Sequence, residues 1–296
     1  MPFPTILQRP IAAATAAAGL LLALSACTPA SSTPESAPPS SSTNDAAAGL
    51  PGTHVHGLSV NGAAGQVLLA THEGLFDVSK KPAVKIGPAN DLMSFTAARG
   101  QGVFYASGHP GKDSSLPSPM GLIRTIDGGK TWEQLSRQNE SDFHALAATK
   151  SGIVAFDGNL RTSTDGATWK SVAASFTPAA LAGNPYSDTV LATTRDGVQR
   201  STDGGATWTL DKAAPVIQFA AFASAREAVG AAPDGTVYYS ADAGSTWKQT
   251  GKIPGEVQAV AATEGTDGNP WLWAATPTGL VVSTDGGATF RPSDAD

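Results

Sequence analysis

The stretch STDGGATW (residues 201–208) decides the fold, because close copies of it recur along the chain. The copies are TIDGGKTW (125–132), STDGATW (163–169), SADAGSTW (240–247) and STDGGATF (283–290). Their aspartates are 38, 38, 39 and 43 residues apart, at Asp127, Asp165, Asp203, Asp242 and Asp285. A period near 40 residues, with strand patterns and no helical pattern between the copies, is typical of a β-repeat protein. The spacing predicts an all-β fold, the β-propeller.

Each copy is suited to a tight turn between the two outer strands of a blade. The Asp-Gly-Gly sequence allows positive φ angles, and the Asp carboxylate and the Ser or Thr hydroxyl can bind the amides of the turn. The Trp then begins the next strand and packs its ring under the turn. These copies are therefore expected to hold the fold.

These residues resemble the Asp-box of bacterial neuraminidase repeats, which has the pattern S-x-D-x-G-x-T-W. The resemblance covers residues of about 53 to 292. In that family the box is a structural fastener on the propeller face opposite the active site. The resemblance implies the same architectural role for the five aspartates, and no catalytic one.

The strand pattern predicts six four-stranded blades. First strands are expected at 54–60, 94–98, 143–149, 179–182, 217–222 and 257–262. Second strands are expected at 67–70, 103–106, 153–156, 190–193, 228–231 and 271–275, and the third strands lead into the boxes. Blade 1 has no box, which fits the atypical end repeats of such proteins. Five or seven blades are the alternatives.

The start of the chain resembles a bacterial lipoprotein leader. Residues 1–26 hold one positive charge, Arg9, and then an apolar run that is too short to span a membrane, which predicts a secretory signal peptide. The sequence LSAC (24–27) is similar to a lipobox, which implies lipidation of Cys27, the one cysteine of the chain. Residues 27–52 form a Ser-, Pro- and Thr-rich tether, and residues 53–296 form the propeller. We expect a monomer held by lipid on the outer face of the cytoplasmic membrane, at the cell surface or in the periplasm.

The charge of the chain argues against nucleic acid as a partner. The whole sequence has 19 basic and 25 acidic residues. Removing the leader with Arg9 leaves 18 basic residues and a net charge of −7 (18 − 25). Nucleic acids and anionic lipid surfaces bind basic patches, which this acidic composition does not favour.

All five histidines are predicted on the face opposite the boxes, in blades 1 to 3: His54, His56, His72, His109 and His144. A His-x-His pair on a strand directs both rings to one side, and imidazole suits Cu and Zn. Glu73, Glu140 and Asp142 can complete or orient such a site. The pattern predicts one transition-metal ion in the propeller mouth. The alternative is a set of rings that only line solvated surface.

Other residues of this mouth support competing interpretations. Asp91, Glu140 and Asp142 are candidate acids for glycoside hydrolysis, which needs two carboxyls beside a sugar bond. Met93 and Met120 would favour copper if they were ligands, although methionines more often fill gaps in a core. The loop 107–119 is the largest insertion, and insertions of this kind often map to a functional face.

The segments THVHGL (53–58) and ATHEGLF (70–76) are similar to the first blade of a family of exported bacterial propellers classed as glycosyl hydrolases. Sialidases use three arginines, a Tyr paired with a Glu, an Asp, and an Arg-Ile-Pro stretch. This chain has no Arg-Ile-Pro, Arg195 is the one obvious arginine expected on the site face, and its four tyrosines show no evident partner. The sialidase catalytic set is therefore not found.

Three functions compete at this level. The first is a binding propeller that takes a metal ion or a glycan at its histidine-rich mouth. The second is a glycoside hydrolase, with Glu140 and Asp142 as catalytic candidates. The third is a protein-binding scaffold, since the photosystem assembly propeller is a relative in repeat type.

Overall fold

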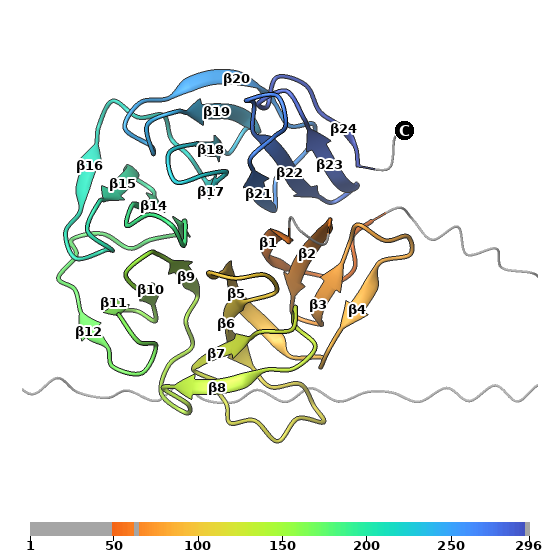
Figure 1. The fold of residues 1–296 in the computed structure, drawn as a ribbon, viewed down its shortest axis with the longest axis vertical. Helices are drawn as coiled ribbons and strands as arrows, with labels where there is room; N and C mark the ends of the chain where they lie inside the picture. The colour runs from red at the N-terminus through yellow and green to blue at the C-terminus, as the bar shows by residue number, and fades with distance from the viewer. Residues whose placement is uncertain (1–48, 62–64, 294–296) are drawn as a thin grey trace, which may run out of the picture. The chain divides into compact units, whose positions relative to one another are not determined.

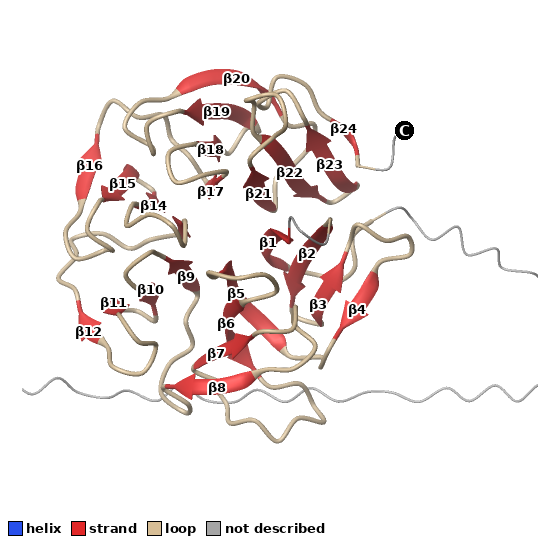
Figure 2. Cartoon of the chain, in the orientation of Figure 1, coloured by secondary structure: helices blue, strands red, loops and turns tan. Residues whose placement is uncertain are grey.

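The computed structural model describes residues 49–61 and 65–293. In these residues all regular secondary structure is β-strand, and the strands form six four-stranded antiparallel sheets (Figure 2). The sheets stand around a ring as the blades of a six-bladed β-propeller (Figure 1). The predicted leader and Cys27 lie outside the described residues. Within the described residues, no helix is long and apolar enough to cross a membrane. The predicted fold class and blade number are confirmed.

Each blade is made of four consecutive strands that pair in chain order. Blades 1 and 2 are β1 (Val55–Asn61), β2 (Gln66–Thr71), β3 (Gly74–Asp77), β4 (Val84–Ile86), β5 (Asp91–Ala97), β6 (Phe104–His109), β7 (Leu122–Thr125) and β8 (Glu133–Ser136). Blades 3 and 4 are β9 (Ala145–Ala148), β10 (Ile153–Phe156), β11 (Leu160–Ser163), β12 (Lys170–Ser171), β13 (Ala180–Gly183), β14 (Val190–Thr194), β15 (Gly197–Ser201) and β16 (Thr209–Asp211). Blades 5 and 6 are β17 (Phe219–Phe222), β18 (Ala228–Ala231), β19 (Thr236–Ser240), β20 (Lys248–Lys252), β21 (Ala259–Thr263), β22 (Trp271–Thr276), β23 (Gly279–Ser283) and β24 (Arg291–Pro292).

The ring closes between the first and the last blade. The first strand of each blade lies beside the first strand of the next, and β21 lies beside β1 (Figure 1). Among the described strands, none is shared across this junction, because every sheet is built from consecutive strands. Leu58 and Val67 of blade 1 pack instead against Ala259 and Ala261 of blade 6. Apolar packing therefore holds the ring closed.

The Asp-boxes are the turns between third and fourth strands, as predicted. In blade 4 the Ser201 hydroxyl accepts the amide of Gly205 at 2.9 Å and donates to Oδ1 of Asp203 at 2.8 Å. The other end of the turn is fixed by Thr207, which donates its amide and its hydroxyl to the Asp203 carboxylate at 2.9 and 2.6 Å. Gly205 has φ 89°, and a Cβ there would lie 2.6 Å from a methyl carbon of Val154 in blade 3. Each box thus fastens its own hairpin and seals the blade before it.

The alternation of strand directions gives the ring two faces. The boxes lie on one face, which we call the box face. The turns between second and third strands, and the connections into each first strand, lie on the other face. All five histidines belong to these turns, connections or adjoining strand ends, so we call it the histidine face.

Candidate metal centre at the propeller mouth

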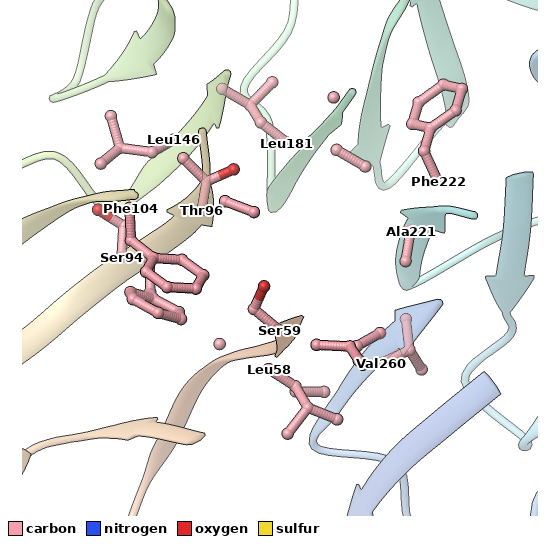
Figure 3. A pocket seen from close by; sticks show the side chains of 18 of the residues that line it. Leu58, Ser59, Ser94, Thr96, Phe104, Leu146, Leu181, Ala221, Phe222 and Val260 are labelled. Atoms are coloured by element: carbon pink, nitrogen blue, oxygen red, sulfur yellow. The ribbon is translucent and has the colours of Figure 1, made fainter. Parts of the chain in front are cut away.

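A cavity of about 640 Å³ lies at the centre of the ring, surrounded by the first strands of all six blades. Its wall is made of small, aliphatic and aromatic side chains with a few hydroxyls, among them Ser59, Thr96, Leu181 and Phe222 (Figure 3). Among the described residues, no Asp, Glu, Lys or Arg lines it. Its titratable lining groups are His56 and His144 toward the histidine face and Tyr186 toward the box face. The charged side chains of the histidine face therefore lie around the opening of the cavity and not on its wall.

His56, His72 and Asp91 come together at the junction of blades 1 and 2. Nε2 of His56 lies 3.3 Å from Nε2 of His72, and Nδ1 of His72 lies 2.8 Å from Oδ1 of Asp91. In the described part of the chain, these three form a group able to surround a metal ion. The His54 ring meets the His72 ring edge-on, with centroids 5.0 Å apart. The predicted convergence of His54, His56 and His72 is thus present in the structure, with Asp91 added.

Local backbone irregularities aim these side chains. His56 sits in a β-bulge of β1, where the register with β2 shifts between Val55 and Gly57, and a bulge re-aims a side chain. Asp91 begins β5, which has a bulge of its own between Leu92 and Ser94.

Gly108 pairs with Leu92 and has φ 145°, and a Cβ there would stand 2.1 Å from the Asp91 carbonyl oxygen. The close approach of strands β5 and β6 thus requires glycine at position 108.

The His72 turn is fixed by its neighbours. The Thr71 hydroxyl donates to the carbonyl of Gly74 at 3.0 Å and accepts the amide of Glu73 at 3.1 Å. The Glu73 carboxylate accepts the Thr53 hydroxyl at 3.1 Å. Burial raises the pKa of Glu73, but the hydrogen bonds from Thr53 outweigh it and leave that pKa lowered. Glu73 therefore ties down the segment that carries His54, which is the orienting role that the sequence analysis considered for it.

The contacts of His72 favour one tautomer. Nδ1 of His72 lies 2.8 Å from Oδ1 of Asp91, and a carboxylate oxygen favours hydrogen on Nδ1, which leaves a lone pair on Nε2. The Asp91 contact is close but is not aligned as a hydrogen bond, and Oδ1 remains buried without a donor. Burial, with His72 as the second cause, lowers the pKa of His56 below its ordinary 6.5. His56 is thus suited to ligation as a neutral imidazole.

His109, Asp142 and His144 form a second group at the junction of blades 2 and 3. Nε2 of His109 and Nε2 of His144 lie 3.1 and 2.9 Å from the same oxygen, Oδ2 of Asp142. Nδ1 of His109 also contacts the Ser118 hydroxyl at 3.2 Å. The structure therefore divides the five predicted histidines between two neighbouring groups.

The two catalytic candidates are held by different partners. Asp142 lies between the two histidines, whereas Glu140 is an exposed side chain 3.3 Å from Nη1 of Arg137. Arg137 and Arg161 both contact the buried Asp157, at 3.8 and 2.9 Å. The prediction that Arg195 is the one obvious arginine on this face is therefore wrong. The sequence analysis missed this group because its members meet only when the turn after β10 folds against the connection that leads into β9.

One further prediction is corrected, and one open alternative, for Met120, is decided. Tyr239 has a partner, because its hydroxyl donates to Oε1 of Glu227 at 2.7 Å. This pair lies at the box-face ends of β18 and β19, away from the histidines, and burial together with that hydrogen bond raises the pKa of Tyr239 to about 12. A raised pKa disfavours a nucleophilic phenolate. Met120 is fully buried in the core of blade 2, so it is a packing residue, while Met93 does line the central cavity.

Comparisons with known proteins agree with the architecture. A family model described as BNR/Asp-box repeat matches residues 199–210, and no curated protein matches the chain. The propeller is similar to a GH74 xyloglucanase from Xanthomonas campestris, with 15% identity and a TM-score of 0.52 over 76% of this chain and 37% of that chain. It is also similar to virginiamycin B lyase from Staphylococcus aureus, with 14% identity and a TM-score of 0.51 over 82% of this chain and 86% of that one. It is similar as well to YCF48 from Cyanidioschyzon merolae, with 12% identity and a TM-score of 0.50 over 78% of this chain and 95% of that one.

These likenesses concern the fold alone, because every identity is 15% or lower. The chain spans 37% of the length of the xyloglucanase, so the activity of that larger enzyme does not transfer with the likeness. The chain is therefore a six-bladed β-propeller that carries BNR/Asp-box repeats and resembles glycoside hydrolase propellers.

Proposed function

We propose that the protein is an exported lipoprotein, acylated at Cys27, whose propeller binds one divalent transition-metal ion between His56 and His72. The observation that carries the metal site is the 3.3 Å separation of the two Nε2 atoms. Two imidazole nitrogens bound to one zinc ion at about 2.0–2.1 Å are about 3.3 Å apart when the angle at the metal is tetrahedral. The pair thus has the spacing of two ligands of one ion.

Asp91 supports this site from behind His72. A carboxylate on the far nitrogen of a ligating histidine fixes the tautomer and orients the ring, and Asp91 holds that position. The exposed His54 ring touches His72 and can supply a third nitrogen, with water completing the coordination. Imidazole ligands with one carboxylate suit zinc and copper.

The location rests on the leader. The lipobox LSAC and the tether that follows support an anchored propeller whose histidine face meets the fluid outside the cytoplasmic membrane. One or two acyl chains on Cys27 would hold it there, since each buried methylene contributes about 0.8 kcal/mol.

Metal uptake by chelator-stripped protein tests the site. We expect the native chain to bind zinc or copper, and a His56→Ala/His72→Ala variant to lose that ion. Arg195→Ala is the matched control for the turn. Thr194 forms the same hydrogen bonds in blade 4 that Thr71 forms in blade 1, with Arg195 at the position of His72. Absence of uptake by the native chain, or uptake unchanged in the double variant, would refute the site.

The same preparations separate binding from hydrolysis. Aryl glycosides and sialosides should give no turnover above that of a Glu140→Gln/Asp142→Asn variant. Turnover that this variant abolishes would replace the binding proposal with a glycoside hydrolase.

A further inference from the structure

The pairing of a histidine with an aspartate recurs at successive blade junctions. His72 follows β2 of blade 1 and faces Asp91, the first residue of the next blade's inner strand. His109 ends β6 of blade 2 and faces Asp142, three residues before the inner strand of blade 3. Each junction also holds a second histidine, His56 at the first and His144 at the second. The two junctions therefore carry the same set of groups, two imidazoles and one carboxylate.

We propose that His109, Asp142 and His144 form a second binding site for a divalent transition-metal ion, separate from the His56–His72 site. Both Nε2 atoms point at a single carboxylate oxygen, at 3.1 and 2.9 Å. The other oxygen of that carboxylate, Oδ1, is buried and has no hydrogen-bond partner. A buried carboxylate oxygen without a donor is costly, and a cation bound beside it removes that cost.

Nε2–H of His109 can donate to Oδ2 of Asp142, and Nε2 of His144 lies 2.9 Å from the same oxygen. When an ion binds, each ring carries its proton on Nδ1 after exchange with water. Each Nε2 then presents a lone pair, and the rings close around the ion. The side chain of His144 is 56% exposed, so it has room to rotate. The His109 ring keeps its place, because a Nδ1–H can donate to the Ser118 hydroxyl that now lies 3.2 Å away.

This site gives a role to the longest loop of the propeller. The loop runs from β6 to β7 and brings Ser118 against His109. Its start is held by a hydrogen bond from the Gly111 amide to the side chain of Asn90, and its end by one from the Asn139 amide to the carbonyl of Pro119. Ser118 is thus a positioning residue for the second site, and the loop is fixed on both sides of it.

The two sites share one mouth. His56 and His144 both border the central cavity. They are close enough that His144 is one of the groups that lower the pKa of His56, after burial, His72 and His54. We therefore expect two ions near each other on the histidine face, bound by separate ligands.

Stoichiometry tests the second site independently of the first. The full chain is stripped of metal and titrated with Zn²⁺ against a chromophoric chelator. We expect two equivalents for the native chain and one for each of the variants His56→Ala/His72→Ala and His109→Ala/His144→Ala. The combination of all four substitutions should bind none. Thermal unfolding of each variant, beside Arg195→Ala, checks that the propeller is folded.

A substitution outside the ligands adds a second readout. Ser118→Ala should lower the affinity for one of the two zinc ions by about 10–100-fold, as loss of an orienting partner does. The affinity for the other ion should be unchanged, and Ser118→Thr should restore the lowered affinity. A single native equivalent that is lost with His56 and His72 would overturn the second site and leave the proposed function standing. A single equivalent that is lost only with His109 and His144 would support the second site and overturn the proposed His56–His72 site. Two equivalents that persist without His109 and His144 would also overturn the second site.

Discussion

Replacement of Asp203 by Ala should destabilise the propeller and leave the histidine face unchanged. Its carboxylate accepts hydrogen bonds from the Ser201 hydroxyl at 2.8 Å and from the amide and hydroxyl of Thr207 at 2.9 and 2.6 Å. The substitution removes all three while keeping Gly204 and Gly205, whose positive φ angles shape the turn. The loss is therefore confined to the fastening of one hairpin.

The expected magnitude follows from those three contacts. A hydrogen bond contributes about 0.5–1.5 kcal/mol net, and the exposure of the turn places each near the lower end. The sum is a loss of about 2 kcal/mol in the free energy of unfolding. For a domain of this size, each kcal/mol shifts the midpoint of thermal unfolding by about 2–4 °C. We expect the midpoint to fall by about 4–8 °C.

Circular dichroism during heating measures this shift, and the metal titration measures the histidine face. Asp196→Ala is the control, because Asp196 is exposed on the opposite face of the same blade. It should change stability by less than about 0.5 kcal/mol. An unchanged midpoint in Asp203→Ala, or loss of metal binding with full stability, would refute the architectural role of the box.

Three further predictions concern pH and location. Hydrogen bonds from Thr131 lower the pKa of Asp127 to about 2, and those from Thr168 lower that of Asp165 to about 2. A depressed folded-state pKa stabilises the fold above the ordinary value of 3.8, so the unfolding midpoint should drop as pH falls from about 4 to about 2; a flat profile would argue against it. Because burial holds the pKa of His56 below 6.5, metal affinity should weaken mainly below pH 6.5, and a metal titration at pH 7.5, 6.5 and 5.5 should show it. Cys27→Ser should release the protein from the membrane fraction on cell fractionation, and retention there would exclude the lipid anchor.

Most of the fold is predictable because the box is local. All the hydrogen bonds that fix it join residues within eight positions, so STDGGATW carries its own turn. The predicted second strands accordingly fall within β2, β6, β10, β14, β18 and β22, apart from Val103 just before β6. The first strands are less exact, since β5 begins at Asp91 rather than at residue 94, and β9 at Ala145 rather than at residue 143. Bulges and cross-blade contacts set these starts, and neither has a local sequence signal.

The candidate site is predictable only in part for the same reason. The spacing of His54 and His56 is visible in the chain, and the location of all five histidines on one face follows from the strand count. The contact of His72 with Asp91 is different, because it joins two blades across 19 residues and depends on the bulges in β1 and β5. The Tyr239–Glu227 pair escaped notice likewise, since register alone brings its members together.

The repeat itself explains why chemistry is concentrated at blades 1 to 3. In the turn between the second and third strands of blades 1 and 4, a threonine hydroxyl donates to the carbonyl of the glycine three residues later. The residue after the threonine is His72 in blade 1 and Arg195 in blade 4. Asp91 begins the first strand of blade 2, whereas the connection after blade 4, KAAPVIQ (212–218), and Phe219 at the start of β17 carry no carboxyl. A histidine in the blade 4 turn would therefore lack the group that fixes its tautomer. The contacts that the blades share build the ring. The proposed metal ligands arise where blades depart from these contacts, with a carboxyl at the start of one blade facing a histidine at the end of a strand in the blade before.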